Sequence, residues 1–223
     1  MRMTKRRRLG LIVATAAAVL GTAGTAAVTL SGFSASIVNP TNTFSSATVQ
    51  LEEGNGVTNC FSTGTGTGGS VTSANQNTNC ANDAFGAPLT QVPGGAATSS
   101  TVTVTNVGNV GASSGSLAAG SCAAAAAAND GGYVGSDTAG FCGLVDVTIY
   151  NSTTGNCVLP AGAGACPAPS SSNTLANIGT VTLPALAAGA NNQYVLTTQL
   201  DSSATNADQG LTATVPLTWT INQ

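Results

Sequence analysis

Residues 211 to 221 alternate strictly, with apolar side chains at the odd positions and threonine or proline at the even ones. A period of two indicates a β-strand that buries one face, and threonine suits the outer face because its branched Cβ favours extended backbone. At roughly 3.3 Å per residue the strand would be about 36 Å long. Pro216 has no N–H to donate, which favours an edge strand or a bulge. The inward-facing residues are Leu211, Ala213, Val215, Leu217, Trp219 and Ile221.

The charge distribution predicts a signal peptide. All five basic side chains lie within the first eight residues, and the uncharged residues 9–30 follow. A basic segment before an apolar one is typical of secretion. The alternative is a membrane anchor, because the apolar run is long enough to span, although it is rich in weakly partitioning Ala, Gly and Thr. We expect residues 1–32 to be removed and residues 33–223 to form one secreted domain, with membrane contact only through an uncleaved signal segment.

The remaining chain has no Lys, Arg or His and carries eight carboxylates. Nucleic-acid binding is therefore not expected, since no basic patch could neutralise phosphates. No imidazole is available to activate a serine, there is no G-x-S-x-G, and Glu52 and Glu53 would point to opposite faces of a strand. The sequence predicts no enzyme, no catalytic residue, no cofactor and no metal site.

Six cysteines in an exported chain predict disulfides, for which 15 pairings are possible. Their separations favour sequential pairs that each close a loop of small polar residues. Zinc is the alternative, but there is no His and no C-x-x-C. The expected pairs are Cys60–Cys80, Cys122–Cys142 and Cys157–Cys166.

Short alternating runs separated by Gly-, Asn- and Ser-rich segments predict an all-β sandwich, of the jelly-roll or immunoglobulin-like kind, with about seven or eight strands. Val102, Val104 and Val107 are expected in its core. The alanines at 123–128 predict one short helix, because alanine has the highest helix propensity. The segments 55–93 and 151–173 are expected to be loops stapled by disulfides. Strands are expected at 33–37, 47–51, 98–110, 144–150, 178–183, 194–200 and 211–221.

The first expected strand carries Phe33, Ala35 and Ile37 on one face, and Asn39-Pro40 then interrupts it. A strand on a hinge at one end and a long edge strand at the other make a head-to-tail pair, which builds filaments because it does not close. The alternative is that residues 33–38 pair within their own chain or form an unstructured terminus.

Three stretches resemble the TasA/camelysin family of secreted bacterial proteins. They are Gly32-Phe33-Ser34-Ala35 with the NTFSSATVQL run at 42–51, the TVTVTNVG run at 101–108, and the NADQG loop at 206–210 before the terminal strand. The cysteine-bearing loops and the missing lysines depart from the family pattern. The resemblance implies processing by a SipW-type signal peptidase, a jelly-roll fold, and homopolymeric fibres of the extracellular biofilm matrix or cell surface. It also implies assembly by donor-strand exchange through the mature N-terminal strand.

Two other functions compete with the fibre. One is a monomeric surface adhesin, whose loops carry Asp83, Asp130 and Asp137 and could hold calcium weakly, although no D-x-D-x-D spacing supports this. The other is a camelysin-like surface protease, for which the chain has no H-E-x-x-H. Self-association distinguishes an adhesin from a fibre subunit.

Overall fold

The computed structural model describes residues 47–64, 75, 78–86, 90–127 and 134–223. The expected signal peptide, 1–32, and the expected polymerisation strand with Phe33, Ala35 and Ile37 lie outside these residues. Residues 47–223 cluster into one unit, and the following description concerns this unit alone. No helix in the described ranges is long and apolar enough to cross a membrane.

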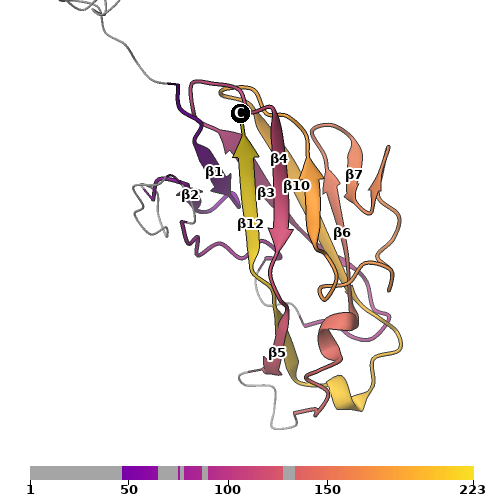
Figure 1. The fold of residues 1–223 in the computed structure, drawn as a ribbon. Helices are drawn as coiled ribbons and strands as arrows, with labels where there is room; N and C mark the ends of the chain where they lie inside the picture. The colour runs from indigo at the N-terminus through magenta and orange to yellow at the C-terminus, as the bar shows by residue number, and fades with distance from the viewer. Residues whose placement is uncertain (1–46, 65–74, 76–77, 87–89, 128–133) are drawn as a thin grey trace, which may run out of the picture. The chain divides into compact units, whose positions relative to one another are not determined.

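The larger layer is an antiparallel sheet in which the described residues supply seven strands, in the order β2-β1-β3-β10-β6-β7-β8 (Figure 1). β3 and β10 are its longest strands, and both alternate between buried and more exposed residues. The bounds are β1 Leu51–Gly54, β2 Asn59–Phe61, β3 Thr98–Asn106, β6 Val145–Asn151, β7 Asn156–Leu159, β8 Ala161–Gly162 and β10 Asn191–Leu200.

The smaller layer is a three-stranded antiparallel sheet, β12-β4-β9, which packs face to face with the larger one. Figure 1 shows β12 and β4 side by side, with the C terminus at the end of β12. Side chains from both layers share one buried cluster, so the expected all-β sandwich is confirmed. The bounds are β4 Ser114–Ala119, β9 Thr180–Leu183 and β12 Leu217–Asn222.

The C-terminal alternation is present, but it does not form one strand. β11 (Leu211–Thr214) and β12 (Leu217–Asn222) are separated at Val215 and Pro216 and belong to different sheets. Leu211 and Trp219 are buried, whereas the four threonines of the stretch are exposed. The pattern therefore predicted the buried face correctly and the continuity wrongly. β12 is the outer strand of its sheet, as the proline suggested.

The expected helix at 123–128 is wrong over its described part. Ala123–Ala126 form β5, which pairs with β11 in a two-stranded sheet. Six consecutive alanines are too few to sustain an isolated helix, and the adjacent Cys122 is bonded to Cys142. Pairing with β11 therefore outweighs the local propensity. The described helices are the 3-10 turns η2 (Phe141–Gly143) and η3 (Asn206–Asp208).

The core contains Val102 and Val104 as expected, but Val107 is 37% exposed because β3 ends one residue earlier, at Asn106. The Asn106 side chain turns inward instead, donating to the carbonyls of Val110 and Leu186 at 2.8 and 3.1 Å. Glu52 to Gly54, which follow the strand expected at 47–51, form most of β1. The 47–51 strand is thus displaced toward the C terminus.

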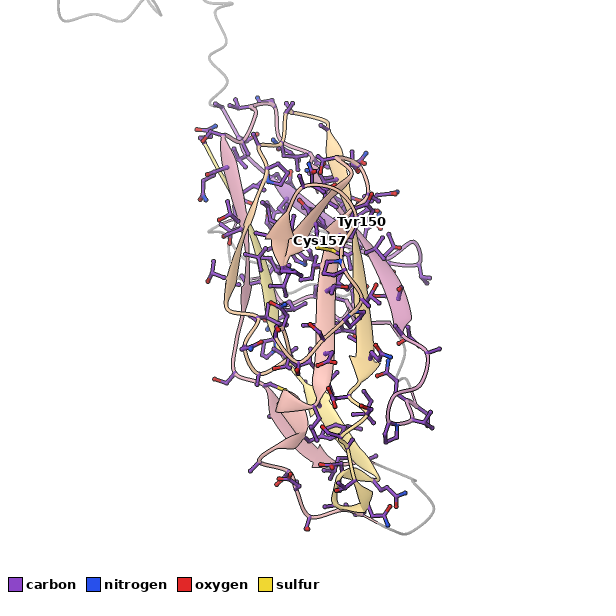
Figure 2. All side chains as sticks on the ribbon, turned by 90° about the vertical axis from the view of Figure 1, so that its right-hand side faces the viewer. Tyr150 and Cys157 are labelled. Carbon is purple, nitrogen blue, oxygen red and sulfur yellow. A yellow bond between two sulfur atoms is a disulfide. The ribbon has the colours of Figure 1, made fainter. Side chains whose placement is uncertain are left out.

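Three disulfides join the six cysteines sequentially, as Cys60–Cys80, Cys122–Cys142 and Cys157–Cys166. The expected loops contain short strands: β2 carries Cys60, and β7 carries Cys157. Cys157 lies opposite Tyr150 of β6, and both residues are labelled in Figure 2. The Cys60–Cys80 and Cys157–Cys166 disulfides therefore anchor the two expected loops to strands near the two margins of the larger sheet.

Candidate functional site

The outer edge of β12 is the strongest candidate for a functional surface. β12 pairs with β4 on one side and has no strand on its other side among the described residues. The Gly120 N–H donates to the Pro216 carbonyl (2.8 Å) and the Ser113 N–H to the Asn222 carbonyl (2.7 Å), so even-numbered residues face β4. Peptide groups alternate in direction along an antiparallel strand. Leu217, Trp219 and Ile221 therefore direct their N–H and C=O groups to the open edge.

The side chains of the same three residues point into the sandwich. Trp219 is 8% exposed, and its ring lies 5.0 Å from that of Tyr194 in β10, tilted by 37°. Burial raises the pKa of Tyr194 to about 12. The Trp219 Nε1–H is buried and has no hydrogen-bond partner in the described part of the chain. A strand added at this edge would extend a ladder whose side chains already belong to the core.

The smaller layer covers only part of the larger one. β9 packs against β7, and Trp219 in β12 packs against Tyr194 in β10. β3 and β1 therefore continue beyond β12. Leu51 and Glu53 of β1 lie opposite Asn106 and Val104 of β3, which are buried, so they share this inner face.

Glu53 marks the inner face beyond β12 as a desolvated environment. Burial raises the pKa of its carboxyl from 4.5 to about 7. No Lys or Arg occurs after position 8 to offset the charge. A carboxylate on this face is therefore costly to ionise, and the surroundings favour apolar occupants.

Residues 78–86 cover part of this inner face without pairing with β12. Cys80 is bonded to Cys60, the Asn82 Nδ2 donates to the Thr58 carbonyl (3.2 Å), and Ala84 is buried in the core. Among the backbone hydrogen bonds of the described residues, none joins this segment to β12. Within the described ranges, the outward peptide groups of β12 therefore have no strand partner.

The acidic loop residues considered for calcium have local structural roles. The Asp83 carboxylate accepts from the Phe85 N–H (2.9 Å), and that of Asp137 accepts from the Gly140 N–H (2.9 Å). Asp130 lies outside the described residues. Within those residues, no group of three or more His, Cys, Asp or Glu side chains could hold a metal ion. The sequence reasoning missed β4, which is the partner of β12, and it missed the desolvated position of Glu53. Leu51 was the available signal for Glu53, because residues two apart on a strand share a face and an apolar Leu51 is expected to point inward.

No protein-family model matches the chain, and a search of curated proteins returned no match.

Proposed function

We propose that this protein is a secreted structural subunit that polymerises head-to-tail into extracellular or cell-surface fibres by donor-strand exchange. A SipW-type signal peptidase would release Phe33 at the new N terminus. Residues 33–38 of one subunit would then pair with β12 of the next. This is the assembly that the resemblance to the TasA/camelysin family implies.

The open edge of β12 is the observation that carries the proposal. Residues 217, 219 and 221 point their peptide groups outward and their side chains inward, which is the arrangement that an added strand requires. An incoming strand with Phe33, Ala35 and Ile37 on one face would place these apolar side chains above the inner face of β1 and β3. Its alternate residues, Ser34 and Ser36, would face solvent.

Three disulfides agree with an oxidising compartment, and the absence of basic residues after position 8 leaves trypsin-like proteases no cleavage site. Both properties suit a long-lived extracellular material. They support the proposed location in the matrix or on the cell surface without specifying the assembly.

Negative-stain microscopy of the mature secreted protein tests the proposal, with the intact chain compared with one lacking residues 33–38. We expect fibres from the first and monomers from the second. Trp219 is the only tryptophan and lies on the accepting strand, so its fluorescence reports docking in solution. A change in emission should accompany assembly of the intact chain.

Two matched pairs of substitutions locate the contact. Replacing Phe33 and Ile37 by serine should abolish fibres, whereas replacing Ser34 and Ser36 by threonine should preserve them. On the accepting strand, Ile221→Pro removes an N–H from the open edge, and Ile221→Ala removes only side-chain contacts. Fibres that form equally well without residues 33–38, or an intact chain that stays monomeric, would refute donor-strand exchange.

A further inference from the structure

A second feature lies on the outer face of the larger sheet, away from β12. Val147 and Ile149 of β6 are fully buried in the core, so Asp146 points to the opposite face. Gln199 of β10 lies directly across from Asp146, and the alternation continues to Asp201, whose N–H donates to the Leu144 carbonyl (2.8 Å). The three side chains therefore gather on one side of the sheet.

These residues line a surface pocket of about 280 Å³. Residues 173–175 run along the start of β6, with the Val147 N–H donating to the Asn173 carbonyl (2.8 Å) and the Leu175 N–H to the Val145 carbonyl (2.9 Å). This segment brings the hydroxyl-bearing Ser170 and Ser171 to one wall, and Ser202 lies on another. The pocket is thus lined by oxygen-bearing side chains around two carboxylates.

Asp146 is the unexplained member of this group. The residue is 4% exposed, and its Oδ1 is buried without a hydrogen-bond partner in the described part of the chain. A buried carboxylate oxygen without a donor is costly, since desolvation penalises its charge. In most proteins a lysine or arginine would offset this cost, but here every basic residue lies between positions 2 and 8.

Asp201 adds a second negative charge to the same pocket. Its carboxylate accepts from the Ser203 N–H (2.7 Å), and this backbone hydrogen bond lowers its pKa, so the group stays ionised. Burial and then the charge of Asp201 raise the pKa of Asp146. Neutralising this pair would therefore require a proton on Asp146 or a cation from solution.

We propose that Asp146 and Asp201 bind a calcium ion in this pocket. The atoms available to coordinate a cation are all oxygens, namely those of two carboxylates, the Gln199 amide oxygen and nearby hydroxyls. Such ligands suit a hard cation and not zinc. Because each water occupies roughly 30 Å³ in the liquid, the pocket has room for the ion and several waters to complete its coordination. The ion would fix the end of β10 to segment 169–175. This site is independent of the β12 edge and of fibre formation.

Equilibrium dialysis of the mature protein against CaCl2 tests the site directly. We expect about one ion per chain, with a Kd between roughly 10⁻⁴ and 10⁻³ M, the range of extracellular modules. Asp146→Asn and Asp201→Asn should each weaken binding by at least about tenfold, because each removes half of the ligand charge. Asp83→Asn is the matched control, since Asp83 also accepts a backbone N–H two residues ahead but lies outside the pocket.

Thermal unfolding gives a second readout, with ionic strength matched by NaCl. Calcium at about 10 mM should raise the Tm of the wild type and of Asp83→Asn by several degrees, and that of the two pocket variants by much less. Without calcium, Asp146→Asn should be at least as stable as the wild type, because it removes an uncompensated buried charge. Absence of binding by the wild type, or binding that Asp146→Asn leaves unchanged, would overturn the proposal.

Discussion

β10 and β12 both alternate, and they meet through Tyr194 and Trp219, yet they occupy opposite situations. β10 is paired along most of its length with β3 on one side and β6 on the other. β12 is paired only with β4 in the described part of the fold. The alternation in each strand specifies which face is buried. It carries no information about how many neighbours the strand has, and that number separates a structural strand from one able to accept a partner.

The two strands also differ in what their inward faces tolerate. β10 buries the polar residues Asn192 and Thr198, and the hydroxyl of Thr198 accepts from the Gln91 Nε2 at 3.2 Å. β12 places only apolar residues inward, and two of the three, Leu217 and Ile221, remain partly exposed. A central strand is stabilised by ladders on both sides. β12 has a ladder on one side among the described residues, and its partly exposed Leu217 and Ile221 would gain from further cover.

A matched pair of leucine truncations tests this comparison and should give the largest effect. Leu196 in β10 is 1% exposed, whereas Leu217 in β12 is only partly buried. Leu196→Ala should lower the free energy of unfolding by roughly 3 kcal/mol and Leu217→Ala by about 1 kcal/mol, because the second leaves a smaller cavity. Urea unfolding of the monomeric chain lacking residues 33–38, followed by circular dichroism, measures both.

The intact chain sharpens the same comparison. If the N-terminal strand of a neighbour covers β12, Leu217→Ala should cost more in the fibre than in the monomer, and the cost of Leu196→Ala should not change. Equal costs for the two leucines in the monomer would contradict the distinction between a central and an edge strand.

Much of the fold could be predicted because the alternation of apolar and polar residues shows which face of each strand is buried. The pattern located β3, β6, β9 and β10 to within a few residues, and it assigned Val102 and Val104 to the core. Period-two alternation is the same whichever sheet a strand belongs to and whichever strands it pairs with, since it depends only on which side of the strand faces the core. For the same reason it could not show that the terminal stretch divides between two sheets.

The errors occur where tertiary contacts outweigh local preference. β4, the centre of the smaller sheet, contains the run SGSLAA with one large apolar residue, Leu117, so it gives almost no pattern. β5 consists of four alanines, the residue type with the highest helix propensity, yet they form a strand beside β11. Asp146 alternates with the buried Val147 and so lies on the outer face, but its burial there depends on the distant segment 169–175. None of these long-range contacts has a local signal.

Replacing Glu53 on the inner face beyond β12 should change the free energy of unfolding by an intermediate amount, and this change should depend on pH. The folded-state pKa of Glu53 is about 7 and its ordinary value is 4.5, so the folded chain holds the proton more tightly. This contribution to stability is complete below about pH 4.5 and is lost as the pH rises to about 7. Glu53→Gln should therefore gain stability over the wild type as the pH rises, by on the order of 1–2 kcal/mol at pH 8.

Urea unfolding between about pH 4 and 8 measures the change. Glu52→Gln is the matched control, because Glu52 is the adjacent acid of β1 but accepts from the Asn59 Nδ2 at 2.6 Å on the opposite face. A stability difference between Glu53→Gln and wild type that does not vary with pH would mean that the inner face beyond β12 is well solvated.

Replacing Pro216 should change the stability of the protein least of all. The substitution tests why β12 is separate from β11. The proline is exposed, and β4 ends at Ala119 while β5 begins at Ala123, so the break also occurs on the partner side. Gly120 donates to the Pro216 carbonyl at the break, and a Cβ on Gly120 would lie 3.3 Å from the proline ring. Pro216→Ala should therefore change stability by less than about 1 kcal/mol and leave the amides of residues 215 and 216 open to hydrogen exchange. If these amides instead become protected and the chain is markedly stabilised, the missing N–H alone divides the strand, and the two-sheet geometry follows from one residue.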